Sequence, residues 1–426
     1  MAEHRGTPAD TTTTGPLWRN RNFDTYWAGQ AVSQLGDRVS ELAIPLTAVA
    51  VVGASATQVG MLTAAIWLPN LLALGFGSWV DRQHRRRRVL VAADLASAAV
   101  VLTVPAAHVL GVLALPQLFV VALLLGAAAT LYQSAWQPFF VTLVRRDQYV
   151  EANSLLSTTR SVSFVAGPAI GGALVQALTA PVALAVDGVS FLVSAVLLRR
   201  VRVVERPAPT TTEPGSLAAR VRAGMRIVLR HPYLAPALRC VTWVNAFTFM
   251  VSAVVLVFAN RTLGLSAGTI GLALGVGALG GVGGALAAAP IARRIGTGRT
   301  IALGAVVFTM PLAGLALAGT GPVPPAVVLG VVEGVSGFGV MLFDVNLNAV
   351  QAVVTPDAAR GRVVGAFTTI NYGVRPLGAV LGGVLADVIG IRPTLVLGGV
   401  GGSLAVLWLL GTPVLGVRSV DDLEPG

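Results

Sequence analysis

The chain has 426 residues, of which 54% are apolar and only 12% charged, and its mean hydropathy is +0.76. Soluble domains carry about one quarter charged residues, so this composition predicts a membrane protein. The net charge of +11 falls in short arginine clusters between apolar runs, a distribution that argues against binding of nucleic acid.

The sequence contains few residues in the patterns that enzymes use for catalysis. Every basic residue is arginine, so the chain has neither the lysine of a phosphate-binding GxxxxGK loop nor a lysine for Schiff-base chemistry. The single cysteine, Cys240, and the four scattered histidines lack the spacing of metal ligands. We therefore expect no catalysis, no cofactor and no metal site.

Apolar runs of about 20 residues, the length that crosses a bilayer, occur twelve times. They cover residues 23–49, 57–80, 89–111, 115–141, 155–178, 182–199, 238–260, 267–289, 299–319, 323–346, 363–389 and 393–416. The predicted fold is therefore an all-α integral membrane protein with twelve transmembrane helices. The polar, threonine-rich residues 1–22 are expected to be a disordered cytoplasmic tail, and residues 417–426 a second cytoplasmic tail.

The positions of the arginines predict the orientation, because arginines next to membrane spans stay on the cytoplasmic side. They precede the first span and fill the segments after spans 2, 4, 8 and 10, whereas the alternate segments hold only Arg261 and Arg392. Both termini are therefore predicted to be cytoplasmic, in a multi-pass protein of the inner (cytoplasmic) membrane.

The longest polar segment, residues 200–237, divides the chain into six spans at 23–199 and six at 238–416. Within it, an apolar stripe alternates with arginines at helical spacing. The stripe comprises Leu217, Val221, Met225 and Val228, and the opposite face carries Arg222, Arg226 and Arg230. This pattern predicts an amphipathic helix on the inner membrane surface, or a charged anchor that only separates the halves.

The two halves repeat each other in sequence. GSWVDRQHRRRRVL follows span 2 and GALAAAPIARRIGTGRTIAL follows span 8, each with a small-residue helix end and then arginines. After spans 4 and 10 the glycines also correspond, with Gly167, Gly171 and Gly172 matching Gly378, Gly382 and Gly383. Two six-helix repeats around a central cavity are typical of a transporter whose halves rock against each other.

Two motifs resemble those of the major facilitator superfamily. The first matches the loop signature GxxxDRxxRR, with Gly77, Asp81, Arg82, Arg85 and Arg86. The second, GPAIGG, resembles the antiporter signature of span 5, with Gly167, Pro168, Gly171 and Gly172. Further strings, such as VDGVSFLVSA, resemble the branch that contains macrolide-efflux and enterobactin-exporter proteins, and the RxxxGxG motif of other drug antiporters is missing from span 4.

The resemblance implies that the first loop is a latch between conformations. Asp81 is then expected to dock on the start of span 11, near Arg362 to Val364, and to close the cytoplasmic side in the outward-open state. Asp94 is expected to pair with Arg85 or Arg86. The alternative is a loop that only sets topology. The small residues of GPAIGG predict close helix packing, and its proline predicts a bend.

Ionisable groups inside spans cost several kcal/mol to insert and usually face a cavity or a partner. In span 1, Asp37 and Glu41 share a helix face, and Arg38 is spaced to pair with Glu41. Like charges this close favour binding of a proton, so Asp37 and Glu41 are candidates for proton coupling. Glu333, near the middle of span 10 and surrounded by glycines, is a third candidate. Their expected charge partners are Arg38, Arg160 and Arg375; a structural ion network is the alternative.

Aromatic residues of the inner spans are candidates for stacking on a substrate ring, namely Trp136, Trp243, Phe247, Phe249 and Tyr372. Together these features predict a proton-coupled exporter, or antiporter, of a small molecule such as an antibiotic, acting as a monomer. Two alternatives stay open. One is a siderophore exporter, in which Arg375 attracts an anionic substrate. The other is a lysophospholipid flippase or scramblase without proton coupling.

Overall fold

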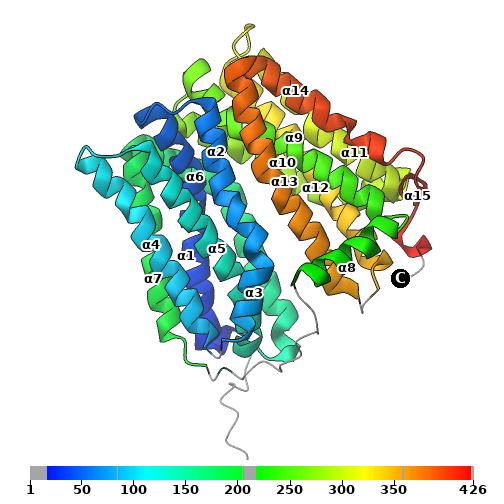
Figure 1. Ribbon diagram of the computed structural model, residues 1–426, viewed down its shortest axis with the longest axis horizontal. Coiled ribbons are helices and arrows are strands. Elements are labelled where there is room, and N and C mark those ends of the chain that lie inside the picture. The colour runs from blue at the N-terminus through cyan, green and yellow to red at the C-terminus, as the bar shows by residue number, and fades with distance from the viewer. Residues whose placement is uncertain (1–16, 84, 204, 206–216, 357–358, 424–426) are drawn as a thin grey trace, which may run out of the picture.

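The structure is a computed structural model, which describes residues 17–83, 85–203, 205, 217–356 and 359–423. Most of the predicted N-terminal tail lies outside these residues. All regular elements of the described part are helical, and they form two bundles side by side (Figure 1). Each predicted span corresponds to one helix or to one continuous helical run.

The first bundle holds six helical runs, in chain order. They are α1 (Arg21–Leu46) with η2 (Thr47–Val51), α2 (Ala56–Trp67) with η3 (Leu68–Leu72) and α3 (Ala73–Asp81), α4 (Arg86–Val109), α5 (Leu115–Leu143), α6 (Tyr149–Leu178) and α7 (Ala180–Arg200). α6 begins six residues before the predicted start at 155, because the polar sequence YVEANS continues the helix beyond the apolar run.

The second bundle follows the linker helix α8 (Leu217–Arg230). Its runs are α9 (Leu234–Val257) with η5 (Phe258–Thr262), α10 (Ala267–Ile295), α11 (Thr297–Thr309) with η6 (Met310–Leu317), α12 (Pro325–Val354), α13 (Arg360–Val388), and α14 (Ile391–Ser403) with η8 (Leu404–Trp408), before the short α15 (Pro413–Gly416). Nine helices of the described residues are long and apolar enough to cross a membrane, or ten if the bent α2–α3 run counts as one span.

The bundles touch at one end and separate at the other (Figure 1). We call the end that holds the start of α1, the end of α3 and α8 the terminal face, and the opposite end the far face. Contacts between the bundles join α2 to α13 and α6 to α10. One hydrophobic cluster toward the far face includes residues of both bundles, such as Leu62 and Val251. Toward the terminal face, each bundle has a separate cluster of its own.

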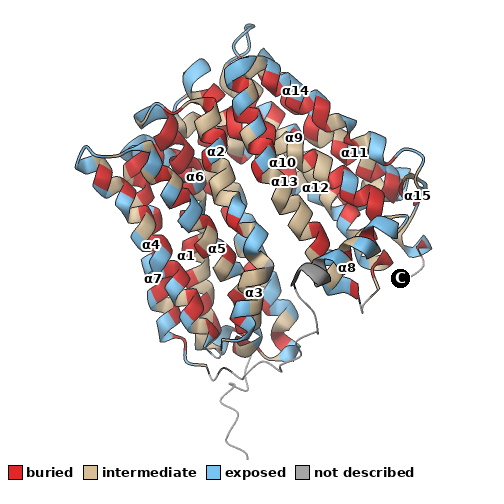
Figure 2. Ribbon diagram, in the orientation of Figure 1, coloured by how far each residue is buried: buried red, intermediate tan, exposed pale blue. Residues whose placement is uncertain are grey.

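Exposed residues occur along the helices of both bundles (Figure 2), and many of them are large apolar side chains. Leu286 is 75% exposed on α10 and Leu377 is 70% exposed on α13. Exposed leucine along helices that can span a bilayer is the arrangement expected of side chains in contact with lipid. The described part of the chain is therefore a multi-pass membrane protein.

The linker helix α8 packs against α13 and α9 of the second bundle, and its position on the inner membrane surface stays a prediction. A Cβ atom on Gly224 would overlap the carbonyl oxygen of Arg362, so the two helices approach closely there. Val228 is buried, whereas Arg222, Arg226 and Arg230 are exposed, as the stripe predicts. The side chains of Leu217 and Val221 lie outside the described residues.

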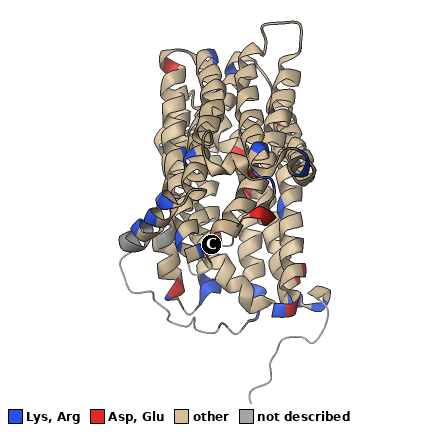
Figure 3. Ribbon diagram, turned by 90° about the vertical axis from the view of Figure 1, so that its right-hand side faces the viewer, with Lys and Arg blue, Asp and Glu red and all other residues tan. Residues whose placement is uncertain are grey.

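Arginines gather toward the terminal face, and few lie near the far face (Figure 3). Two arginines near the far face donate hydrogen bonds to backbone carbonyl oxygens. Arg261 donates to Val49 O across the bundles at 3.0 Å, and Arg392 donates to Ala318 O at 2.9 Å. The uneven distribution of arginines, from which the sequence predicts the orientation in the membrane, is thus also present in the folded chain.

Candidate functional site

Three charged residues in the second half of α1, Asp37, Arg38 and Glu41, divide into an ion pair and an unpaired acid. Arg38 Nη1 lies 2.7 Å from Glu41 Oε2, the pair that their spacing predicts, and the guanidinium also lies over the ring of Phe164 at 5.3 Å. The exposed Asp37 has no hydrogen bond or ion pair to any described residue. Arg160, its predicted partner, is exposed on α6 and forms no ion pair with it, so that prediction is wrong.

Two buried acids lie behind Asp37, on α7 and α4. Asp187 is 1% exposed and accepts hydrogen bonds from Ser40 of α1 and from Ser190 at 3.1 Å. Asp94 is 3% exposed, and its Oδ2 has no hydrogen-bond partner among the described residues. The charges that act on Asp37 are those of Asp187, Glu41, Arg38 and Asp94. Three helices thus bring four acids together around one arginine.

The predicted pairing of Asp94 with Arg85 or Arg86 is wrong. Asp94 lies eight residues beyond Arg86 on the same helix, about 12 Å along the axis, and it faces the interior instead. The start of α4 is capped by Glu205 of the linker, which accepts hydrogen bonds from the backbone N–H groups of Arg86 and Arg87. Sequence reasoning missed this cap, because Glu205 is more than 100 residues away in the chain.

A second cluster surrounds Arg375 of α13. Its guanidinium carbon lies 4.5 Å from the ring centre of Trp67, 4.6 Å from that of Tyr372 and 5.0 Å from that of Phe249. Its Nε donates a hydrogen bond to Asn245 Oδ1 at 3.1 Å. Rings around a guanidinium stabilise its charge away from water. Trp67 belongs to the first bundle and the other residues to the second, so the cluster lies between the bundles.

Arg375 was predicted to pair with Glu333 or with Asp37, and it forms an ion pair with neither of them. The charge of Asp344 on α12 acts on Arg375, although the two form no ion pair in the described part of the chain. Glu333 is half-buried at the contact between α12 and α10, where a Cβ on Gly277 would lie 3.2 Å from the Cβ of Glu333. No charged or hydrogen-bonded partner of Glu333 occurs among the described residues.

Three of the five predicted cavity aromatics pack between helices instead. Trp243 donates its indole N–H to Gly401 O at 2.7 Å, and Phe247 fills the recess left by the glycines of α14. Trp136 lies beside Phe140, with 6.0 Å between ring centres, in the terminal-face cluster of the first bundle. Phe249 and Tyr372 belong to the Arg375 cluster. Trp67 was missed, since its sequence context gives no sign of the direction in which it points.

The GPAIGG glycines serve close packing on both sides of α6. Gly167 faces the side chain of Arg38, and a Cβ on Gly171 would lie 3.3 Å from Val39 Cα. On the other side, a Cβ on Gly172 would lie 2.9 Å from Gly271 Cα of α10, in the other bundle. Pro168 lies inside α6, and its carbonyl oxygen approaches Gly271. The motif therefore joins the two bundles as well as packing against α1.

The GxxxDRxxRR loop joins α3 to α4 at the terminal face. Asp81 ends α3 and is exposed, and α3 packs against α5 and η3 of its own bundle. The expected docking position at Arg362 to Val364 is approached by α8 in this conformation. Gly77, Arg82, Arg85 and the buried Arg86 lie in the same loop region. The latch stays a prediction for another conformation.

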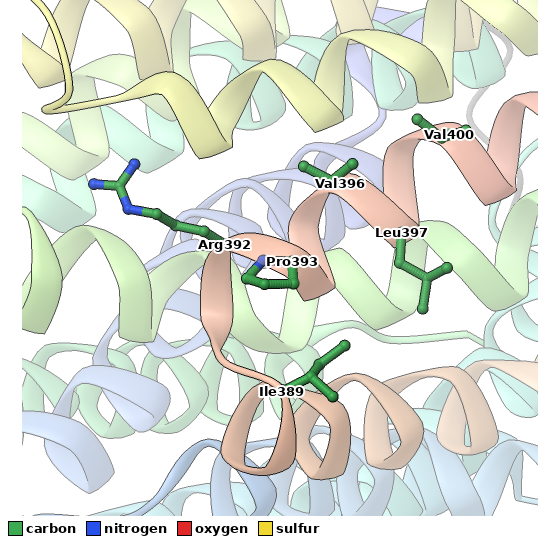
Figure 4. Close-up of a pocket in the computed structure, with 6 residues that line it drawn as sticks. All are labelled: Ile389, Arg392, Pro393, Val396, Leu397 and Val400. Carbon is green, nitrogen blue, oxygen red and sulfur yellow. The ribbon is translucent and has the colours of Figure 1, made fainter.

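One surface groove does not have the character of a polar substrate site. It runs along α14 and is lined by Ile389, Arg392, Pro393, Val396, Leu397 and Val400 (Figure 4). The guanidinium of Arg392 points away from it, over the ring of Phe258 at 5.2 Å. The remaining residues are apolar and face outward, so this groove belongs to the lipid-facing surface.

Two helical bundles that repeat each other, with charged residues at mid-depth between them, define an alternating-access transporter fold. The family comparison gives the particular class. The chain belongs to the Major Facilitator Superfamily, whose family model matches residues 26–379. It is thus a transporter rather than an enzyme.

Curated relatives extend over most of the chain. Multidrug efflux pump Tap of Mycobacterium tuberculosis is 28% identical over 373 residues, 84% of this chain and 85% of Tap. Macrolide efflux protein A of Streptococcus pyogenes is 26% identical over 190 residues, 42% of this chain and 44% of that protein.

Solved structures share the fold. Nucleoside transporter NupG superposes with a TM-score of 0.74 at 10% identity, over 91% of this chain and 98% of NupG. A bacterial homologue of the iron transporter ferroportin, in its inward-facing state, gives 0.71 at 17% identity, over 93% of this chain and 99% of that one. Identities this low show the fold alone.

Proposed function

We propose that this protein exports a small molecule, such as an antibiotic, across the cytoplasmic membrane in exchange for protons. The observation that carries the proposal is Asp37: it is accessible, unpaired and surrounded by the charges of Glu41, Asp94 and Asp187. A proton bound there removes like-charge repulsion inside the first bundle. The names of Tap and of macrolide efflux protein A support export of a drug.

The proposed orientation places the terminal face in the cytoplasm, because the arginines gather there (Figure 3). With that orientation, the shared cluster at the far face closes the outside, and the separate clusters leave the bundles apart on the inside. This is an inward-facing arrangement of a monomeric exporter. Protonation from outside would follow once the far face opens, and release of the proton inside would reset the carrier.

The test uses everted membrane vesicles that take up ethidium when a pH gradient is imposed. Asp37→Asn and Glu333→Gln should each keep normal expression and lower gradient-driven uptake at least about tenfold, because the charge they carry no longer changes. Asp147→Asn is the matched control, since it removes an exposed acid paired with Arg145 away from both sites. Unchanged uptake in both test variants would contradict proton coupling through these acids.

A second candidate, export of an anionic substrate such as a siderophore, is favoured by one observation. Only Nε of Arg375 is used in a hydrogen bond to a described residue, so the two Nη groups can still bind an anion. Arg375→Gln should then abolish export of a catecholate siderophore while ethidium uptake persists. Equal loss of both would favour a structural role for Arg375. Transfer of labelled lysophospholipid without a pH gradient would instead support a flippase or scramblase.

A further inference from the structure

The far face contains two matching helix starts, one in each bundle. SATQVG, residues 55–60, begins α2, and SAGTIG, residues 266–271, begins α10. Each serine hydroxyl accepts a hydrogen bond from the backbone N–H three residues later, Ser55 from Gln58 and Ser266 from Thr269, both at 3.3 Å. Both helices therefore begin with the same local cap.

Each helix start is also capped by a side chain from the other bundle. The Asp387 carboxylate of α13 accepts hydrogen bonds from Ser55 Oγ at 2.8 Å, Thr57 N at 2.9 Å and Ala56 N at 3.2 Å. On the other side of the molecule, Gln176 Oε1 of α6 accepts from Gly268 N at 3.0 Å and from Ser266 Oγ at 3.1 Å.

Asp387 and Gln176 occupy equivalent positions in the two repeats. Gln176 lies four residues after Gly172, and Asp387 lies four residues after Gly383, so each cap is one turn beyond a glycine on the same helix face. Those glycines bring the helices together. A Cβ on Gly383 would lie 2.8 Å from Thr57 Cα. The matching distance at the other helix start, from a Cβ on Gly172 to Gly271 Cα of α10, is 2.9 Å.

We propose that Asp387 and Gln176 are paired locks that hold the far face closed, and that Asp387 is the stronger of the two. A negative charge at a helix N-terminus is stabilised by the free N–H groups and by the helix dipole, whereas a neutral amide gains less. Opening the far face pulls α2 from α13 and α10 from α6, so it breaks both caps. The inference rests on the orientation proposed above, but not on the substrate or on proton coupling.

The accessibility of a buried alanine position between the bundles can be used to measure opening of the far face. Ala253 of α9 is 1% exposed and packs in a cluster with Ala56 and Ala386 near the far face. In a Cys240→Ala background, Ala253→Cys supplies a single thiol that a membrane-impermeant maleimide reaches when the far face opens. The full-length protein in intact cells exposes this face to the reagent under the proposed orientation.

Removal of the negative charge from a helix N-terminus corresponds to a change of about fivefold in the opening equilibrium, because the dipole interaction and the charge-assisted hydrogen bonds are weakened. Asp387→Asn should therefore raise the labelling rate about fivefold, Gln176→Ala should raise it less, and the double variant should raise it most. Gln176→Glu keeps both acceptor contacts and adds a charge, so it should slow labelling. Asp147→Asn, an exposed acid on the terminal side, should leave the rate unchanged.

Labelling rates of Asp387→Asn and Gln176→Ala equal to the parent rate would overturn the proposal. So would faster labelling of Gln176→Glu. Labelling only in everted vesicles would show instead that the orientation is reversed, and would thereby overturn the assignment of these caps to the outer side. Because the assay needs neither substrate nor gradient, its failure is distinct from failure of the ethidium experiment. The Asn and Glu variants keep their side-chain size, which guards against misfolding.

Discussion

The guanidinium of Arg375 lies 4.5 Å from the ring centre of Trp67, although the two residues belong to different bundles. The same ring stacks on Tyr372 at 5.8 Å and meets Phe249 edge-on at 5.3 Å. Trp67 is also the last residue of α2, where the run bends through η3 into α3. The contact therefore joins the bundles at the bend of the α2–η3–α3 run.

Replacing Trp67 by alanine should destabilise the protein by about 0.5–2 kcal/mol, because the cation–π contact with Arg375 and the stacking on Tyr372 are lost. Trp67→Phe should retain part of that stabilisation. The midpoint of thermal unfolding in detergent measures both changes. Trp79→Ala, at an exposed tryptophan on α3, is the matched control. A loss in Trp79→Ala as large as that in Trp67→Ala would contradict a specific role for the cluster.

The twelve spans, the repeat and the two motifs could be predicted because each depends on residues that are close in the chain. Hydrophobic length defines a span, and the glycines of GPAIGG lie within one helix. Phe249 and Tyr372 could be named as candidates, but their assembly with Trp67 around Arg375 could not be predicted, since the three rings come from α2, α9 and α13 and their directions depend on packing. Asp94 shows the same limit: proximity in sequence to Arg86 suggested a pair that the helix geometry excludes.

Replacing Gly172 by valine should prevent the far face from closing. A Cβ at this position would lie 2.6 Å from Ala267 O and 2.9 Å from Gly271 Cα, and backbone atoms have little freedom to move away. We expect the purified variant to favour the open far face and to lose transport at least about tenfold. Gly75→Val is the control, because no atom lies within 4 Å of its Cβ position. Normal transport by Gly172→Val would mean that α6 and α10 separate at little cost.

Replacing Asp187 by alanine should lower the free energy of unfolding by about 1–3 kcal/mol, because Ser40 loses its acceptor in a buried site. Ser190 loses only one of its two acceptors, since its hydroxyl also donates to the backbone carbonyl oxygen of residue 187 at 2.8 Å. Ser190→Ala removes one donor but leaves the acid bonded to Ser40, so its effect should be smaller. Thermal unfolding of the two variants in detergent gives the comparison. An effect of Ser190→Ala equal to that of Asp187→Ala would show that the carboxylate itself contributes little.

The joint between α8 and α9 should weaken in acid because of His231. Partial burial lowers the pKa of this imidazole below its ordinary value of 6.5. Its Nδ1 accepts from the backbone N–H groups of Tyr233 at 3.3 Å and Leu234 at 3.4 Å, and a proton on that nitrogen removes the acceptor. Since the unfolded chain binds the proton more readily, the stabilisation is present above pH 6.5 and is lost as the pH falls through the lowered pKa.

Titration of ¹⁵N-labelled histidine by NMR measures this directly, with His231→Ala to assign the resonance. The His231 resonance should titrate below pH 6.5. Proteolysis of the linker should speed up over the same pH range in the parent protein and should not change with pH in His231→Ala. A midpoint at or above 6.5 would mean that the ring is better solvated than its contacts with α9 indicate, and the linker would then be anchored by the packing of α8 on α13 alone.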